Sequence, residues 1–200
     1  MSLRRNVMGG LAVLGALALV LGLGGGVYGM ALVRRGFSAR AEPSALEATV
    51  ARAARGFSIP EEGRALKNPL EPLSAQARSE ARAHWGDHCA ICHAANGSGQ
   101  TPIGQGLYPR APDMRDTMTQ ALSDGELYWI IQNGVRLTGM PAWGQPHDGN
   151  GNHDSWALVG LIRRLRGLSP EELGEIEAGM PQSQHERQEQ RLEDQFLEGP

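Results

Sequence analysis

Apolar residues are concentrated in one long run near the start of the chain. Arg4 and Arg5 precede an uncharged stretch from Asn6 to Val33, which is 28 residues of mostly Leu, Val, Ala, Met and Gly. A helix needs about 20 such residues to cross the hydrocarbon core of a bilayer. Residues 1–35 are therefore predicted to form a single N-terminal transmembrane helix. A cleaved signal peptide is the alternative, although its apolar region is normally shorter, about 7–15 residues.

The next segment, residues 36–73, is much more polar and has the composition of a tether. Ser44 is a good N-cap, and the Ala-rich stretch after it predicts one short helix over residues 45–55. Regular structure beyond it is interrupted by Gly56, Pro60, Gly63, Pro69 and Pro72. We expect a semi-rigid spacer here.

Apolar positions return at helical spacing from Ser74 to Leu168. They predict helices over residues 74–83, 126–132 and 156–166, the second capped by Ser123 or Asp124 and the third by Asp154 or Ser155. Ser169-Pro170-Glu171-Glu172 is a capping box, and it predicts a further short helix that ends near Ala178. No stretch has the alternating pattern of a strand, so the predicted fold class is all-α.

The pentapeptide Cys89-Ala90-Ile91-Cys92-His93 carries the clearest chemistry in the chain. C-x-x-C-H is the attachment signature of a c-type haem. Two thiols on one helical turn can both reach the vinyl groups on one edge of a porphyrin, and the following imidazole then falls under the iron. The motif predicts one covalently bound haem c, held by Cys89 and Cys92, with His93 as an iron ligand.

A candidate for the second iron ligand is Met140, which lies 47 residues after His93 in Gly139-Met140-Pro141-Ala142-Trp143. Gly and Pro on either side place the methionine on an irregular segment that can fold back over the haem face. His and Met together ligate iron in electron-transfer cytochromes. The alternative for Met140 is an ordinary core position.

The two cysteines have other interpretations. A disulfide between residues three apart closes almost no loop and cannot stabilise a fold. A thioredoxin-like dithiol needs a βαβ context, which the pattern lacks. A zinc site would need four ligands drawn from the two cysteines, His84, His88 and His93, and their spacing is crowded.

Charge is distributed unevenly behind a net charge of −3. Residues 1–40 carry five Arg and no acid, residues 74–168 eight bases and eight acids, and residues 169–200 two Arg and nine acids. No basic patch with interleaved aromatics is present, so we expect no nucleic-acid partner. Two hundred residues allow one compact domain with appendages, and a bound haem would add apolar bulk to a core poor in aromatics.

Residues 74–168 resemble a membrane-anchored class I cytochrome c. Trp85 stands four residues before the first haem cysteine, where that family has an aromatic residue, whereas Ala81 replaces the glycine usual four positions earlier. Residues 123–135, 139–143 and 156–162 are similar to the middle helix, methionine loop and last helix of the family. The predicted anchor (1–35), the tether (36–73) and the short helix with an acidic tail (169–200) lie outside the resemblance.

The resemblance implies a small helical domain around one haem that carries one electron and is not an enzyme. The protein would be a membrane-anchored carrier, or a cytochrome subunit of a respiratory or photosynthetic complex, with redox proteins as partners. Attachment of c-type haem on the outer side of the bacterial inner membrane implies a single-pass protein with a periplasmic haem domain. The alternative is a haem enzyme, or a gas or redox sensor, with an open distal site.

Several further side chains are candidates for supporting roles around the haem. The second ring nitrogen of His93 is expected to donate to the carbonyl of Pro102, Pro109 or Pro112. Haem propionates could accept hydrogen bonds from Tyr108, Arg115, Trp129 or Trp143. We expect His84 and His88 to be solvated or packed rather than metal-bound. The polar loop from Gln145 to His153 is expected to face a partner, and the tail beyond Pro181 to be disordered or docked.

Overall fold

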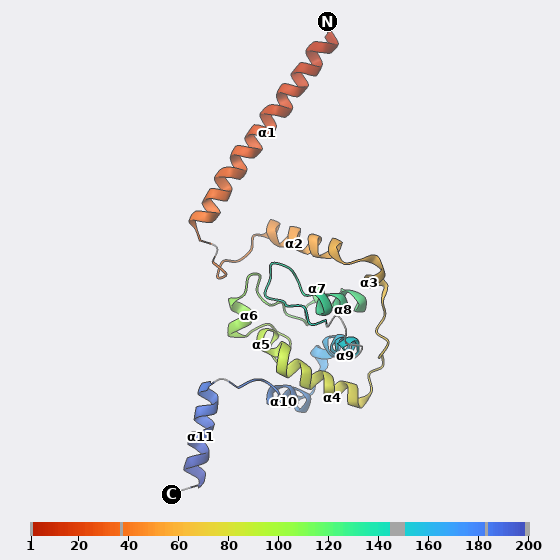
Figure 1. Cartoon of the computed structure of the whole chain (residues 1–200), viewed down its shortest axis with the longest axis vertical. Coiled ribbons are helices and arrows are strands. Elements are labelled where there is room, and N and C mark those ends of the chain that lie inside the picture. Colours follow the sequence, from red (N-terminus) through yellow and green to blue (C-terminus); the bar gives the residue numbers. More distant parts are fainter. Residues whose placement is uncertain (1, 37, 145–150, 183, 199–200) are drawn as a thin grey trace. The chain divides into compact units, whose positions relative to one another are not determined.

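The computed structural model describes residues 2–36, 38–144, 151–182 and 184–198. Within these ranges every regular element is a helix, and the prediction of an all-α fold is confirmed (Figure 1). The chain divides into two compact units, residues 1–41 and residues 42–200. Most of the polar loop expected to face a partner, residues 145–150, lies outside the described residues.

The first unit contains one long helix, α1 (Ser2–Arg34). Its segment from Val7 to Arg34 is long and apolar enough to cross a membrane. The large apolar side chains along it, such as Leu14 and Val20, are exposed in the isolated chain. These properties are compatible with membrane anchoring, and a signal sequence shares them.

The second unit contains all the remaining helices. In chain order they are α2 (Ala45–Ser58), α3 (Glu61–Ala65), α4 (Ala75–His84), a π-helix (Trp85–Cys89), α5 (Ala90–His93), α6 (Pro102–Gly106), α7 (Thr117–Gln120), α8 (Asp124–Asn133), α9 (Gly151–Arg164), a 3₁₀ turn (Leu165–Gly167), α10 (Pro170–Ala178) and α11 (Gln184–Glu198).

Serine caps mark where four of these helices begin. Ser44, Ser74, Ser123 and Ser169 accept hydrogen bonds from the first turns of α2, α4, α8 and α10, and the last two belong to complete capping boxes. The predicted start of α9 is wrong, because this helix begins at Gly151. Ser155 lies inside it, buried, and accepts a 2.7 Å hydrogen bond from Gln132 Nε2. A side-chain partner thus allows a polar residue to be buried within the helix.

The core forms where α4 and α9 pack together and α8 and α10 close the sides. Trp85, Val159, Ile162 and Ile176 are each no more than 1% exposed. The rings of Tyr128 in α8 and Trp156 in α9 stack with centroids 4.1 Å apart. The apolar faces predicted for these helices therefore meet in one core.

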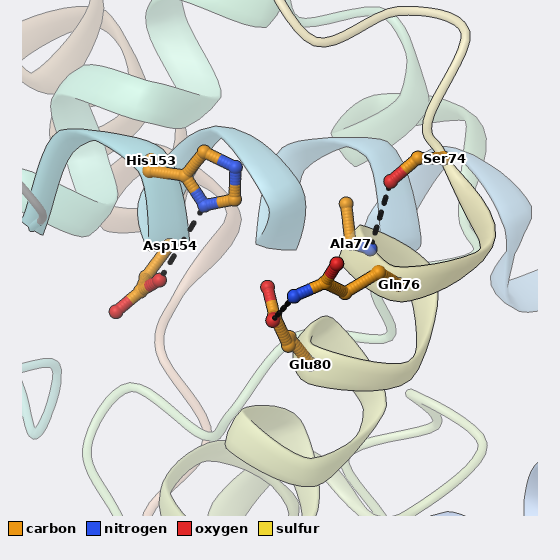
Figure 2. Close-up of a pocket in the computed structure, with 6 residues that line it drawn as sticks. All are labelled: Ser74, Gln76, Ala77, Glu80, His153 and Asp154. Carbon is orange, nitrogen blue, oxygen red and sulfur yellow. Dashed lines mark hydrogen bonds and ion pairs between the residues drawn. The ribbon is translucent and has the colours of Figure 1, made fainter.

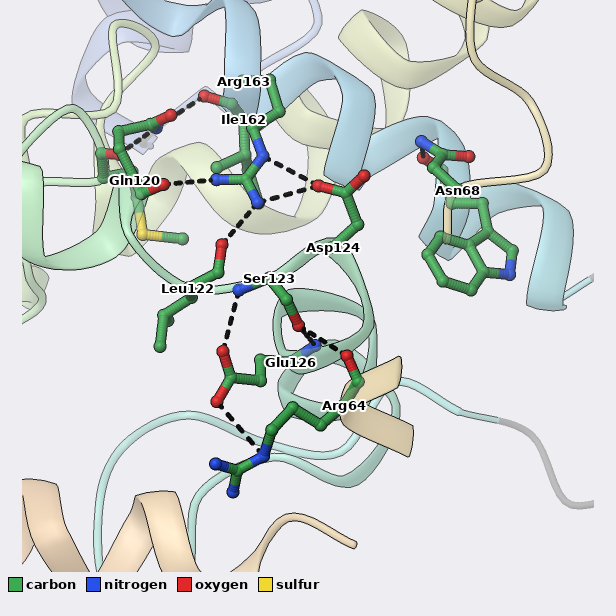
Figure 3. Close-up of polar contacts among 11 residues, drawn as sticks. Arg64, Asn68, Gln120, Leu122, Ser123, Asp124, Glu126, Ile162 and Arg163 are labelled. Atoms are coloured by element: carbon green, nitrogen blue, oxygen red, sulfur yellow. Dashed lines mark hydrogen bonds and ion pairs between the residues drawn. The ribbon is translucent and has the colours of Figure 1, made fainter. Parts of the chain in front are cut away.

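Arg163 of α9 stabilises the contact between α9 and the start of α8 (Figure 3). Its Nε and Nη2 donate to Asp124 Oδ1 at 2.9 and 2.8 Å. The same guanidinium donates to the backbone carbonyls of Gln120 and Leu122, at 2.9 and 2.5 Å. These bonds satisfy two carbonyl groups between the end of α7 and the start of α8, which the N–H groups of α8 do not pair.

Residues 42–73 pack against the helical domain. Ile59 is 3% exposed, and Asn68 Nδ2 donates to the carbonyl of Trp156 in α9 at 2.9 Å. Ser123 Oγ donates to the carbonyl of Arg64 at 2.8 Å (Figure 3). A Cβ added at Gly125 would lie 2.1 Å from the carbonyl oxygen of Gly63, so α3 and α8 touch backbone to backbone. The composition of a tether does not reveal such contacts.

The short helix α10 lies against α4 and the π-helix. Ile176 is fully buried, and a Cβ added at Gly86 would lie 2.5 Å from the carbonyl oxygen of Ile176. Arg82 of α4 binds Glu175 at 2.6 Å and Glu172 at 3.3 Å. Residues 169–178 are therefore part of the folded domain. The helix α11 follows, with Leu192, Phe196 and Leu197 exposed.

Candidate haem-attachment site

The C-x-x-C-H segment spans a change of helix type. Cys89 ends the π-helix, and Ala90, Cys92 and His93 belong to the single turn of α5 that follows. The backbone N–H of Ala90 donates to the carbonyl of Trp85, five residues earlier. Single π turns are rare and occur frequently at functional sites. This one sets the orientation of the two cysteines relative to α4.

The Trp85 side chain holds the C-terminal end of the attachment segment. Its side chain is 1% exposed, and Nε1 donates to the carbonyl of Ala94 at 3.1 Å. Its ring centroid lies 5.9 Å from that of His93. The aromatic residue expected before the motif thus packs on the imidazole, and it also bonds the residue where α5 ends.

His93 is buried, with 9% of the residue exposed. Burial lowers the pKa of its imidazole, and a weaker opposing effect comes from the Pro112 carbonyl, which raises that pKa. Of the three prolines proposed, Pro112 is thus the one whose backbone acts on this ring. Nδ1 is nevertheless buried with no hydrogen-bond partner, so the approach of Pro112 falls short of a full hydrogen bond.

The state of His93 fits the role of an iron ligand. A depressed pKa keeps the imidazole neutral, which leaves a nitrogen lone pair free to bind a metal. Nδ1 is the buried nitrogen without a partner, and Pro112 is the backbone carbonyl that acts on the ring, so Nε2 is the nitrogen left for a metal. The residues present therefore fit a haem group whose iron His93 Nε2 would bind, with Nδ1 held toward Pro112.

The two thiols do not have the properties of a redox dithiol. Burial, with a smaller contribution from Cys92, raises the pKa of Cys89 to about 12, and burial also raises the pKa of Cys92. Reactive thiols have lowered pKa values, because the thiolate is the nucleophile. In the part of the chain that the structure describes, no three His, Cys, Asp or Glu side chains form a group able to hold a metal. Both observations weigh against the dithiol and zinc interpretations.

The loop after the motif closes tightly around the end of α5. Gly99 N–H donates to the carbonyl of His93 at 2.8 Å, and Thr101 Oγ1 donates to that of Ile91 at the same distance. A Cβ added at Gly104 would lie 2.1 Å from the carbonyl oxygen of Cys92. Glycine is therefore required at this position. These contacts bring the loop, and with it Pro112, back to His93.

Met140 lies on an irregular segment, as predicted, and this segment is bonded to the end of α8. The Met140 carbonyl accepts a hydrogen bond from the N–H of Val135 at 3.1 Å, and the Met140 N–H donates to Thr138 Oγ1 at 3.1 Å. Three residues further on, Trp143 N–H donates to the carbonyl of Ile131 at 3.0 Å. The Met140 side chain is half-buried. The loop therefore has a defined path rather than a free one.

A ring contact joins the methionine loop to the attachment segment. The ring of Trp143 packs edge-on against His88, with centroids 5.2 Å apart, and His88 directly precedes Cys89. The ring of His84 stacks on that of His88 with centroids 4.7 Å apart, and burial lowers the pKa of His84. His84 is half-buried and His88 is exposed, and their ring contacts join the residues before Cys89 to the methionine loop.

The candidate propionate donors have different surroundings. Tyr108 donates to Glu47 Oε1 at 2.5 Å, and Arg115 binds Asp113 through two nitrogens at 2.9 and 2.7 Å. The Trp129 side chain lies against Gly63 of α3. The ring of Trp143 contacts that of His88, the residue directly before Cys89.

A surface hollow of about 440 Å³ lies between the first turns of α4 and α9 (Figure 2). Its walls include Ser74, Gln76, Glu80, His153 and Asp154. Gln76 Nε2 donates to Glu80 Oε1, and His153 Nδ1 lies 3.7 Å from Asp154 Oδ1. None of the lining residues belongs to the C-x-x-C-H segment or to the methionine loop, so this hollow is separate from the candidate site.

The helical domain and its C-x-x-C-H segment define a c-type cytochrome domain, a class whose members carry haem c and transfer electrons. Residues 76–160 match the family model described as "Cytochrome C oxidase, cbb3-type, subunit III". This match covers α4 through the middle of α9, including the attachment motif and Met140. The resemblance to a c-type cytochrome is thereby confirmed. No curated protein matches the chain.

Proposed function

We propose that this protein is a membrane-anchored electron carrier with a single, covalently attached haem c. Cys89 and Cys92 would form the two thioether bonds, and His93 and Met140 would bind the iron. Bound haem c supplies an iron that alternates between Fe(II) and Fe(III), which is one-electron chemistry without a transformed substrate.

The observation that carries the proposal is the state of His93. The imidazole is buried, its pKa is lowered by that burial, and Nδ1 lacks a hydrogen-bond partner. It directly follows Cys92 on the single turn of α5, and Cys89 ends the π-helix just before that turn. Trp85 and the Gly99–Thr101 loop fix the turn from both sides, so the ligand is positioned in advance. Little rearrangement of the protein would then accompany electron transfer.

The proposed second ligand is supported by the way its loop is fixed. Hydrogen bonds to Ile131 and Val135, and the ring contact of Trp143 with His88, keep the Met140 segment at the side of the attachment segment. A thioether favours Fe(II) and raises the reduction potential. A closed site with two protein ligands also excludes exogenous gases, which separates this proposal from the enzyme or sensor alternative.

Membrane anchoring and a place in a larger complex complete the proposal. The segment Val7–Arg34 would cross the inner membrane once, with the haem domain on the periplasmic side. The description of the matching family names a subunit of a cytochrome oxidase, which supports a role as a carrier or a cytochrome subunit in a respiratory or photosynthetic complex. The expected partners are redox proteins.

Haem attachment can be tested in membranes from cells that carry a c-type haem maturation system. The full chain should keep haem staining through a denaturing gel, and Cys89→Ala/Cys92→Ala should abolish it. Ser98→Ala, in the loop after the motif, is the matched control and should retain the stain. Loss of stain from the unaltered chain under denaturing conditions would contradict covalent attachment.

A further inference from the structure

The helix α2 presents an apolar stripe that no part of its own domain covers. Leu46, Val50 and Phe57 are 74%, 58% and 91% exposed, and none of the residues of α2 is buried. At about 100° per residue, these three positions fall within about 40° of one another around the helix. Exposed large apolar side chains aligned in this way mark an interaction surface.

The opposite face of α2 is the one that contacts the domain. Its half-buried residues include Ala48 and Arg55, which lie roughly 140–180° around the helix from the stripe. Glu47 accepts a hydrogen bond from Tyr108, and the chain directly after α2 is buried at Ile59. The domain therefore fixes α2 with its apolar stripe directed outward.

The polar side of α2 carries an exposed cation. Glu47 accepts a hydrogen bond from Tyr108 at 2.5 Å, whereas Arg52 is exposed and takes part in no ion pair among the described residues. Arg52 lies roughly 120–160° around the helix from the stripe, a position from which a long side chain can extend to anionic headgroups. In the sequence, Arg34, Arg35 and Arg40 precede α2 by at most eleven residues.

We propose that α2 lies in the membrane interface, with Leu46, Val50 and Phe57 inserted among the lipid headgroups and the exposed Arg52 extended to anionic lipid. The inference rests on the membrane anchoring proposed above. Ten residues separate Arg34, where the apolar helix ends, from Ala45, and they can span at most about 35 Å. A helix restricted to that distance from the bilayer meets lipid at high effective concentration. Aromatic and aliphatic residues on one face, with arginines nearby, are typical of interfacial helices.

This placement has a consequence for electron transfer. Glu47 of α2 bonds Tyr108, which belongs to the loop that returns to the haem-attachment segment. Insertion of α2 would therefore fix the orientation of the domain on the membrane, whereas the anchor alone limits only the distance between the domain and the bilayer. The haem would then face membrane-bound redox partners in a restricted set of orientations.

The inference can be tested with spin labels on the full chain with haem attached, reconstituted in liposomes of phosphatidylethanolamine and phosphatidylglycerol. Because Cys89 and Cys92 would be occupied by haem, a single introduced cysteine can be labelled. A label on Phe57→Cys should be at least about threefold less accessible to a water-soluble nickel chelate than one on Ala51→Cys. Ala51 is exposed and lies about 120° around the helix from Phe57. Leu46→Cys provides a second position on the stripe in case Phe57→Cys does not fold.

Two outcomes separate this inference from the anchoring on which it rests. A label on Val20→Cys, within α1, reports whether the anchor enters the bilayer. If that label is buried in lipid but the labels at residues 46 and 57 are as accessible as that at residue 51, the interfacial placement of α2 is wrong and the anchor stands. If the label at residue 20 is accessible to the chelate, both proposals fail. Protection of residue 57 in native membranes but not in liposomes would assign the stripe to a protein partner and overturn the inference.

Discussion

The rings of His88 and Trp143 meet edge to face with centroids 5.2 Å apart. His88 directly precedes Cys89, the first haem cysteine, and Trp143 lies three positions after Met140. Residues 55 positions apart in the sequence are thus brought together by a contact that uses neither of the proposed iron ligands. The contact gives the methionine loop a fixed position on the attachment segment.

Removing this contact should loosen the methionine loop. Trp143→Ala should lower the free energy of unfolding, and a double-mutant cycle with His88→Ala should give a coupling of about 0.5–1.5 kcal/mol. Trp143→Phe, which retains an edge-to-face ring, is the control and should recover most of the loss. The measurement is denaturant unfolding followed by circular dichroism. A coupling near zero would show that the two rings are neighbours without mutual stabilisation.

Met140→Ala should remove the sulfur ligand without disturbing the covalent bonds to haem. Because a thioether stabilises Fe(II), the reduction potential should fall by roughly 0.1 V or more, within the ~0.8 V range that axial ligands span. Potentiometric titration of the purified protein measures this change. Met118→Ala is the matched control, since Met118 is 59% exposed in α7. Equal potentials in the Met140 variant and the unaltered protein would exclude Met140 as a ligand.

Gly86 should tolerate no side chain. A Cβ there would lie 2.5 Å from the carbonyl oxygen of Ile176, so Gly86→Ala must displace α10 or the π-helix. We expect a loss of about 1–3 kcal/mol in the free energy of unfolding. Gly174→Ala, in α10 with open space around its Cα, should instead stabilise by about 0.5–1 kcal/mol. Destabilisation of similar size by both changes would point to a general effect on α10 rather than the collision at Gly86.

The packing of α10 also predicts where the chain can be shortened. Ending it after Gln182 removes α11 and should leave the haem spectrum and the unfolding midpoint unchanged. Ending it after Leu168 also removes Ile176, which is fully buried, and should destabilise by about 2–5 kcal/mol. Thermal unfolding of the two shortened proteins makes the comparison. Equal midpoints would mean that α10 contributes nothing to the domain.

The ion pairs of α10 should make stability depend on pH. The pKa of Glu172 is lowered below its usual 4.5, first by the backbone N–H of Ser169 and then by Arg164 and Arg82. A lowered folded-state pKa stabilises the protein above the unfolded-state pKa, and this stabilisation is lost as pH falls through the folded-state value. Between about pH 7 and pH 3, the melting temperature of Glu172→Gln should therefore fall less than that of the unaltered protein. A parallel decline in both proteins would contradict this role for Glu172.

Local signals in the sequence predict the parts of the fold that depend on neighbouring residues. Ser123 with Glu126, and Ser169 with Glu172, act within one turn, so their capping boxes can be predicted directly. The start of α9 could not be predicted, because Ser155 is stabilised inside the helix by Gln132, 23 residues away. The backbone contact between Gly63 and Gly125 is equally non-local.

In the candidate site, too, local features can be predicted from the sequence and contacts between distant residues cannot. Cys89, Cys92 and His93 form a contiguous motif, and Pro112 was one of three prolines that could act on the imidazole. The π-helix over residues 85–89 leaves no periodic signal, because it changes the backbone by a single residue per turn. The contact of His88 with Trp143 depends on how two loops return to each other, which spacing alone does not determine.

The account is tested most directly by adding carbon monoxide to the dithionite-reduced, unaltered protein and recording its absorbance spectrum. With His93 and Met140 on opposite sides of the iron, no coordination position is free, and the spectrum should not change. A rapid shift of the haem absorbance on addition of the gas would contradict a closed site, and it would favour a haem enzyme or a gas sensor instead.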